Sequence, residues 1–193
     1  MLTESIEDLN SVLSSPVAME GTNRIDHGHF AGSEEAFRHW DEDPAVPASC
    51  ARCHSADGLP LYLAEGVNIS TMPANGFQCV TCHTDAVEFG LPEVGAVTFP
   101  SGAELDSGDN NMQLCLNCHQ GRSSAVSVDN ALAGKADDTV DEGIRFINIH
   151  YFAAGATVFG TEAKGAYEYA GKTYNGRFEH CLLYTSDAAD EVS

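Results

Sequence analysis

The sequence repeats one short pattern three times: two cysteines separated by two residues and followed directly by a histidine. This Cys-x-x-Cys-His pattern is typical of sites that attach haem c. Two thiols at this spacing can bond to the two vinyl groups of one porphyrin, which holds the adjacent histidine where its imidazole can bind the iron. The three copies are Cys50, Cys53 and His54; Cys79, Cys82 and His83; and Cys115, Cys118 and His119. The sequence therefore predicts three covalently bound haem c groups.

A cysteine pair with this spacing also occurs as half of a zinc site and as a redox-active dithiol. The histidines argue for haem. Because only 8 of 193 residues are histidine, chance would place one after all three pairs on the order of once in ten thousand sequences. Disulfides would require six half-cystines in three identical short loops, which is an unusual framework. A zinc-binding interaction module is kept as an alternative.

Six-coordinate haem irons need a second axial ligand, and histidine or methionine is the usual choice. Met72 and Met112 are available, but the histidines outnumber them and have less flexible side chains. Five histidines remain outside the motifs: His27, His29, His39, His150 and His180. We therefore expect mostly bis-histidine haems, with distal ligands drawn from His150, His39 and His29, and with His27 as the alternative to His29.

We expect His150 to lie on a helix. Apolar residues around it repeat at helical spacing, at Ile144, Ile147, Tyr151, Ala154 and Val158. Thr139 and Glu142 form a capping-box start for this helix. The small residues 153–156 leave room for a flat macrocycle close to the backbone. The competing interpretation is an ordinary buried helix that carries one satisfied histidine.

His39 is expected on a short helix that begins at the N-cap Ser33, has acidic residues in its first turn and ends before Pro44. An aromatic residue directly follows each of the three preferred distal candidates. These residues are Phe30, Trp40 and Tyr151. Such rings could pack on a haem edge, although aromatic residues are also common in protein cores.

The other predicted elements are short and separated by long loops. Residues 58–66 are expected to form two helical turns ended by a glycine, and residues 123–133 a helix ending at Gly134. Alternating residues in 87–99 and in 166–174 predict two small hairpins. The predicted fold class is therefore mainly α with much irregular loop and one or two small β-hairpins.

The amino-acid composition limits the classes of molecule that the protein is expected to bind. The chain has 9 basic and 29 acidic side chains, a formal net charge of -20 and a pI near 4.4. This charge repels nucleic acids and anionic lipids and favours cationic proteins. No apolar stretch is long enough to span a bilayer. With 43% hydrophobic but only 8% aromatic residues, the chain would form a modest core for its length.

Several stretches resemble the bacterial multihaem c-type cytochromes of respiratory chains, the group that includes cytochrome c-554-like and nitrite-reductase-like proteins. They lie at residues 29–34, 36–43, 49–55, 114–122 and 148–157, and the resemblance covers roughly residues 25–180. It implies a multihaem cytochrome c architecture organised by covalent haems that stand within electron-tunnelling distance. It also implies at least one further haem motif beyond His180, which could itself serve that haem.

The resemblance implies an exported electron-transfer protein, located in the periplasm or outside the cell. Its expected partners are other redox proteins, whose basic docking faces would bind its acidic surface. The alternative is a fragment of a multihaem oxidoreductase that acts on a small nitrogen or sulfur compound. The sequence departs from the enzymatic relatives because it has no Cys-x-x-Cys-Lys motif. A catalytic haem is therefore not predicted, and the balance favours a carrier over an enzyme.

The ends of the chain are expected to be atypical. Residues 1–24 form a leader segment, expected to be loosely ordered, without the basic and apolar parts of a signal peptide. Because haem c is normally attached outside the bacterial cytoplasmic membrane, we expect Met1 to be internal or to start an incomplete reading frame. Residues 25–180 form the multihaem domain, which is expected to be incomplete at its C-terminus. Residues 181–193, which include Cys181, resemble a translated sequencing adapter.

Overall fold

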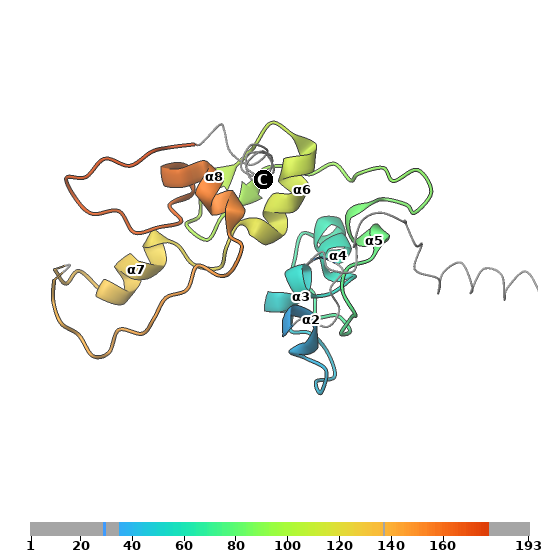
Figure 1. The fold of residues 1–193 in the computed structure, drawn as a ribbon, viewed down its shortest axis with the longest axis horizontal. Helices are drawn as coiled ribbons and strands as arrows, with labels where there is room; N and C mark the ends of the chain where they lie inside the picture. Colours follow the sequence, from blue (N-terminus) through green and yellow to red (C-terminus); the bar gives the residue numbers. More distant parts are fainter. Residues whose placement is uncertain (1–28, 30–34, 137, 178–193) are drawn as a thin grey trace, which may run out of the picture.

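The computed structural model describes residue 29, residues 35–136 and residues 138–177 (Figure 1). The two terminal segments predicted from the sequence, together with His27, Phe30, Ser33, His180 and Cys181, lie outside the described residues. The helices are α2 (Glu35–Arg38), α3 (Ala48–His54), α4 (Gly58–Glu65), α5 (Cys79–Cys82), α6 (Asn110–His119), α7 (Ala125–Leu132) and α8 (Ala154–Ala163). Strands β1 (Val97–Thr98) and β2 (Glu104–Leu105) pair antiparallel. The fold is mainly helical with irregular connections and a small sheet, as predicted.

A buried serine organises the first group of helices, α2 to α5, which lie together in Figure 1. The Ser55 hydroxyl donates to the Ala51 carbonyl at 2.8 Å and accepts from the Gly58 amide at 3.0 Å and the Thr71 hydroxyl at 2.6 Å. These bonds end α3, start α4 and attach the returning chain. Thr81 in α5 donates to the Ala56 carbonyl at 2.8 Å. The helices of the first and second cysteine motifs are therefore held together by the buried hydrogen bonds of Ser55, Thr71 and Thr81.

The second group consists of α6, α8 and the sheet (Figure 1). Its core is apolar and contains Val97, Phe99, Leu116, Ala156, Val158, Phe159 and Ala163. The rings of Phe99 and Phe159 meet edge to face, with centroids 5.7 Å apart. The buried Gln113 of α6 donates to the Gly95 carbonyl at 2.8 Å and accepts from the Ser107 amide at 2.7 Å. This core therefore lies behind the helix that carries the third cysteine motif.

Two of the predicted helices are confirmed, because local chemistry specifies their ends. Helix α4 ends at Gly66, which adopts a left-handed conformation with φ 72° and bonds back to the Tyr62 carbonyl. Helix α7 begins after Ser124, whose side chain forms a capping box with Ser127.

The predicted helix through His150 is wrong. Residues 144–150 are irregular, α8 begins only at Ala154, and His150 has φ 95°. The backbone of this segment is instead used in tertiary contacts, since the Ile149 carbonyl accepts from the Arg122 amide at 2.7 Å. Thr139 does not cap a helix, and its amide bonds to the Ala136 carbonyl in a turn. Tertiary hydrogen bonds have overridden the apolar periodicity.

The two hairpins predicted in residues 87–99 and 166–174 do not form with the predicted pairing. Residues 84–90 fold back as a loop, closed by the Thr84 amide on the Gly90 carbonyl at 2.8 Å, while β1 pairs with β2 on its C-terminal side. In 166–174 the turn is present, with Gly171 at φ 77°, but the flanking residues form no ladder among the described residues. The helix predicted before Pro44 is limited to α2, and His39 follows it directly.

A close contact between α3 and α4 depends on Gly58. A β-carbon at this position would lie 1.9 Å from the Ala51 carbonyl oxygen. We predict that Gly58→Ala lowers the free energy of unfolding by at least about 1–3 kcal/mol, because the two helices would have to separate. Gly95→Ala is the control, since nothing lies within 4 Å of the added carbon. Denaturant unfolding of the haem-loaded proteins, followed by circular dichroism, measures both; equal stabilities would contradict the prediction.

Candidate haem sites

Each cysteine pair lies on a helix that ends at the motif. Cys50 and Cys53 belong to α3, Cys79 and Cys82 to α5, and Cys115 and Cys118 to α6. Positions three apart share one face of a helix, so both thiols of each motif face the same side. All six are free thiols, and none is fully buried. The thiols are therefore arranged as attachment to one flat group per motif requires.

The three motif histidines share one hydrogen-bonding feature. Their Nδ1 atoms bond to backbone carbonyls: His54 to Ala36 at 2.9 Å, His83 to Phe89 at 2.8 Å, and His119 to Phe152 at 2.7 Å. A carbonyl only accepts, so Nδ1 carries the proton and Nε2 keeps its lone pair. Metal-binding histidines are characteristically oriented in this way. All three side chains therefore fit an iron ligand, and no sequence signal could have identified these acceptors.

Two predicted distal histidines have their rings beside motif histidines. The ring centroids of His54 and His150 are 5.8 Å apart, and those of His119 and His29 are 6.0 Å apart. Two imidazoles that bind one metal from opposite sides, with bonds of about 2 Å, have centroids about 6 Å apart. Both pairs therefore have the spacing that bis-histidine ligation requires.

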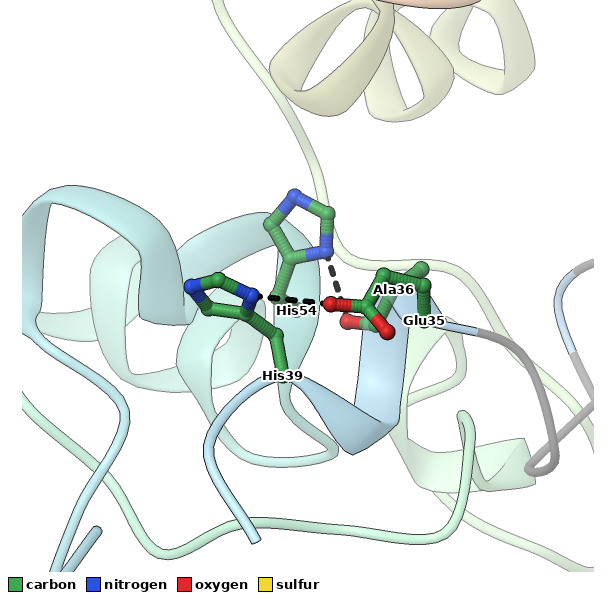
Figure 2. Close-up of polar contacts among 4 residues, drawn as sticks. All are labelled: Glu35, Ala36, His39 and His54. Atoms are coloured by element: carbon green, nitrogen blue, oxygen red, sulfur yellow. Dashed lines mark hydrogen bonds and ion pairs between the residues drawn. The ribbon is translucent and has the colours of Figure 1, made fainter. Parts of the chain in front are cut away.

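His39 is held differently. Its Nδ1 bonds to the Glu35 carboxylate at 2.9 Å, while the neighbouring His54 bonds to the Ala36 carbonyl, so both rings are anchored on α2 (Figure 2). The ring of His39 contacts Trp40, with centroids 4.7 Å apart, and Trp40 in turn lies 5.4 Å from His54. The structure does not pair His39 with a motif histidine, and its role as a ligand stays a prediction.

The second motif is held within its own loop. Phe89 supplies both the carbonyl that accepts from His83 and the ring that lies beside it, with centroids 5.2 Å apart. Phe89 reaches this position with φ 54°, a left-handed conformation that an aromatic residue rarely adopts. In the described part of the chain, no other histidine ring is paired with His83.

Burial and neighbouring charges favour the neutral imidazoles. Burial is the largest cause of the lowered pKa of His54, and the neighbouring His150 and Arg122 lower it further. Burial followed by Arg122 lowers the pKa of His150. Neutral histidine is the form that binds metals, so both members of this pair are suited to ligation near neutral pH.

One thiol is activated by its neighbours. A hydrogen bond from Cys118 is the largest cause that lowers the pKa of Cys53 to about 7, and Arg52 adds to this effect. The same contact, together with burial, raises the pKa of Cys118. The first and third motifs therefore meet at their second cysteines.

The surroundings also have space and apolar surface for a cofactor. A cavity of about 720 Å³ lies beside His150 and is lined by small residues that include Ala153, Ala154, Ala156 and Gly160. Room next to residues 153–156 was expected from the sequence. Phe152 is 85% and Phe89 50% exposed, although both lie at motif histidines. These features fit flat apolar groups bound at the motifs.

The sequence of the chain is similar to those of known c-type cytochromes. The family model for cytochrome c7 and related cytochrome c matches residues 35–120, which contain all three motifs. A polyheme c-type cytochrome of Geobacter sulfurreducens, OmcB, is 28% identical over 172 residues, covering 72% of this chain and 22% of that protein. Another from the same organism, OmcC, is 26% identical over 219 residues, covering 92% and 27%. No solved structure matches the chain.

These similarities support a bacterial multihaem c-type cytochrome and imply covalently bound haem c. It spans about a quarter of the length of the curated relatives that it matches. Its narrower resemblance to cytochrome c-554-like and nitrite-reductase-like proteins stays a prediction. The described residues include no helix long and apolar enough to cross a membrane. They also contain no cluster of three or more His, Cys, Asp or Glu side chains arranged for a metal ion.

Removing one motif should remove one haem. We predict that Cys50→Ala combined with Cys53→Ala lowers the intact mass of the exported protein by one haem, because both thioether bonds of that site are lost. Ser49→Ala is the control, since Ser49 contacts Cys50 at 3.6 Å without belonging to the motif. Mass spectrometry after expression with cytochrome c maturation machinery gives the count, and an unchanged haem content in the double variant would contradict the assignment.

Proposed function

We propose that this chain is an exported electron-transfer protein with at least three haem c groups, most of them bis-histidine ligated. The observation that carries the proposal is the pairing of His54 with His150 and of His119 with His29 at the spacing of a shared metal. A haem iron with two histidine ligands has no open position for a substrate, and it exchanges single electrons between its ferric and ferrous states.

The attachment and ligand residues that we propose follow from these contacts. Cys50 and Cys53 attach the first haem, between His54 and His150. Cys79 and Cys82 attach the second, with His83 on one side. Cys115 and Cys118 attach the third, between His119 and His29. His39 stays a candidate for the remaining position, as does His27 outside the described residues.

Backbone carbonyls that orient the motif histidines and the negative charge of the chain both suit haems that only exchange electrons. The carbonyls of Ala36, Phe89 and Phe152 hold the protons on Nδ1 and so keep Nε2 aimed outward. The chain has a formal net charge of -20. Negative charge disfavours adding an electron, so we expect low reduction potentials.

The proposed location is periplasmic or extracellular, because haem c is normally attached outside the bacterial cytoplasmic membrane. The proposed multihaem unit comprises residues 25–180. Its partners are other redox proteins with basic docking surfaces, since an acidic surface attracts cations and repels nucleic acid and anionic lipid.

The alternative function is reduction of a small nitrogen or sulfur compound, which needs an iron with an open position. The second site is where it would act, because His83 is the motif histidine without a paired histidine ring in the described residues. A high-spin ferric signal assigned to this site in the unmodified protein would favour the enzyme. A fully low-spin spectrum favours the carrier.

Loss of a distal ligand should change the spin state of one haem. We predict that His150→Ala converts one of the haems to high spin, because the first iron loses a strong-field ligand, while the intact mass shows the same number of haems. The matched control is Phe146→Ala on the same segment, whose side chain is 90% exposed. Visible and electron paramagnetic resonance spectra of the oxidised proteins measure the change. An unchanged spectrum of His150→Ala would refute the ligand assignment.

The acidic surface should make electron exchange depend on salt. We predict that the rate constant for oxidation by a small cationic metal complex falls about tenfold as ionic strength rises from low to high, because salt screens the attraction. An anionic complex should show the opposite trend, and a neutral complex provides the control. Stopped-flow absorbance measures all three, and equal salt dependence for cation and neutral complex would contradict the prediction.

A further inference from the structure

We infer that the first and third haem sites are direct neighbours, although the second motif lies between them in the sequence. Two parts of the chain each contribute to both sites: one contains His29 and Ala36, and the other is residues 149–152. This inference rests on the proposed function, because it requires haem at both motifs.

The first observation is a reciprocal contact between α3 and α6. The Cys53 thiol lies 3.9 Å from the Asn117 carbonyl oxygen, and the Cys118 thiol lies 3.7 Å from the Arg52 carbonyl oxygen. Asn117 directly precedes Cys118, and Arg52 directly precedes Cys53. The second cysteine of each helix therefore contacts the residue directly before the second cysteine of the other helix. The sulfur atoms that join the two macrocycles to the chain are thus brought to one place.

The second observation is an exchange of histidine partners. The His29 ring lies beside His119, yet the carbonyl of Ala36, seven residues along the chain, accepts from His54. The segment 149–152 does the reverse. It places the His150 ring beside His54, while its Phe152 carbonyl accepts from His119. Each segment therefore supplies a distal ring to one site and orients the motif histidine of the other.

The third observation is that the shared segment 149–152 docks tightly on the end of α6. The Arg122 amide donates to the Ile149 carbonyl at 2.7 Å. A β-carbon on Gly121 would lie 2.9 Å from that same oxygen, and one on Gly155 would lie 2.9 Å from the His119 carbonyl oxygen. The distance between the segment and the third motif is therefore set by backbone contact, with little freedom to adjust.

The second site differs in construction. The acceptor for His83 is Phe89, six residues away, whereas the acceptors for His54 and His119 are 18 and 33 residues away. A change in segment 149–152 should therefore be felt at the first and third sites together and not at the second. Electrons entering the first site would pass to the third without crossing the second.

The first test compares proteins that each keep two haems. C79A/C82A/H83A keeps the first and third sites, and C115A/C118A/H119A, the matched control, keeps the first and second. Intact mass establishes two haems in each, and electron paramagnetic resonance of the oxidised proteins measures magnetic interaction between the irons. We expect strong interaction when the first and third sites remain and weaker interaction in the control. Equal interaction, or stronger interaction in the control, would overturn the inference.

A second test leaves all motifs in place. Gly121→Val would press on Ile149, whereas Gly134→Val also places a side chain at positive φ but has nothing within 4 Å. We expect Gly121→Val to shift the g-values of two haems, with the third haem and the Gly134→Val spectrum unchanged. A shift confined to one haem, equal shifts in all three, or no shift would contradict shared construction. Proteins without haem, or with only high-spin haem, would instead refute the proposed function.

Discussion

The arrangement of the three motifs depends on hydrogen bonds that hold the motif histidines by Nδ1 from outside their helices. The acceptors are carbonyls of residues that do not belong to the motif helices. Ala36 and Phe152 supply them for the first and third motifs, and Phe89 for the second. Because the bond leaves Nε2 free, packing between segments sets the direction in which each Nε2 atom points.

The buried contacts of the protein lie on the sides of the motif helices that face away from the proposed haem sites. Ser55 ties α3 and α4 together through buried hydroxyl bonds, and an apolar cluster that includes Phe159 supports α6 from the other side. Large side chains near the motifs, such as Phe152, remain exposed to solvent. This distribution is physically consistent with a chain whose interior includes cofactor faces, since apolar surface is stabilised when a flat apolar group covers it.

Local chemistry explains which elements could be predicted. Gly66 and Ser124 specify the ends of α4 and α7 because a left-handed cap and a capping box involve only neighbouring residues. The helix expected through His150 failed because the backbone of 149–152 bonds to the end of α6. The hairpin expected across residues 87–99 failed because Thr84 and Gly90 close a loop around the second motif. In both cases contacts with distant or folded-back residues outweighed an apolar pattern.

The sequence by itself determined where we predict haem attachment, because thioether formation and proximal ligation depend on residues no more than four positions apart. It also identified His150 and His29 as candidates, since any histidine outside the motifs can reach an iron if the chain brings it there. Only the tertiary structure decided which motif histidine each one faces. The acceptor of His119 lies 33 residues along the chain, and pairings over such separations arise from packing of whole segments, which no short pattern of residues encodes.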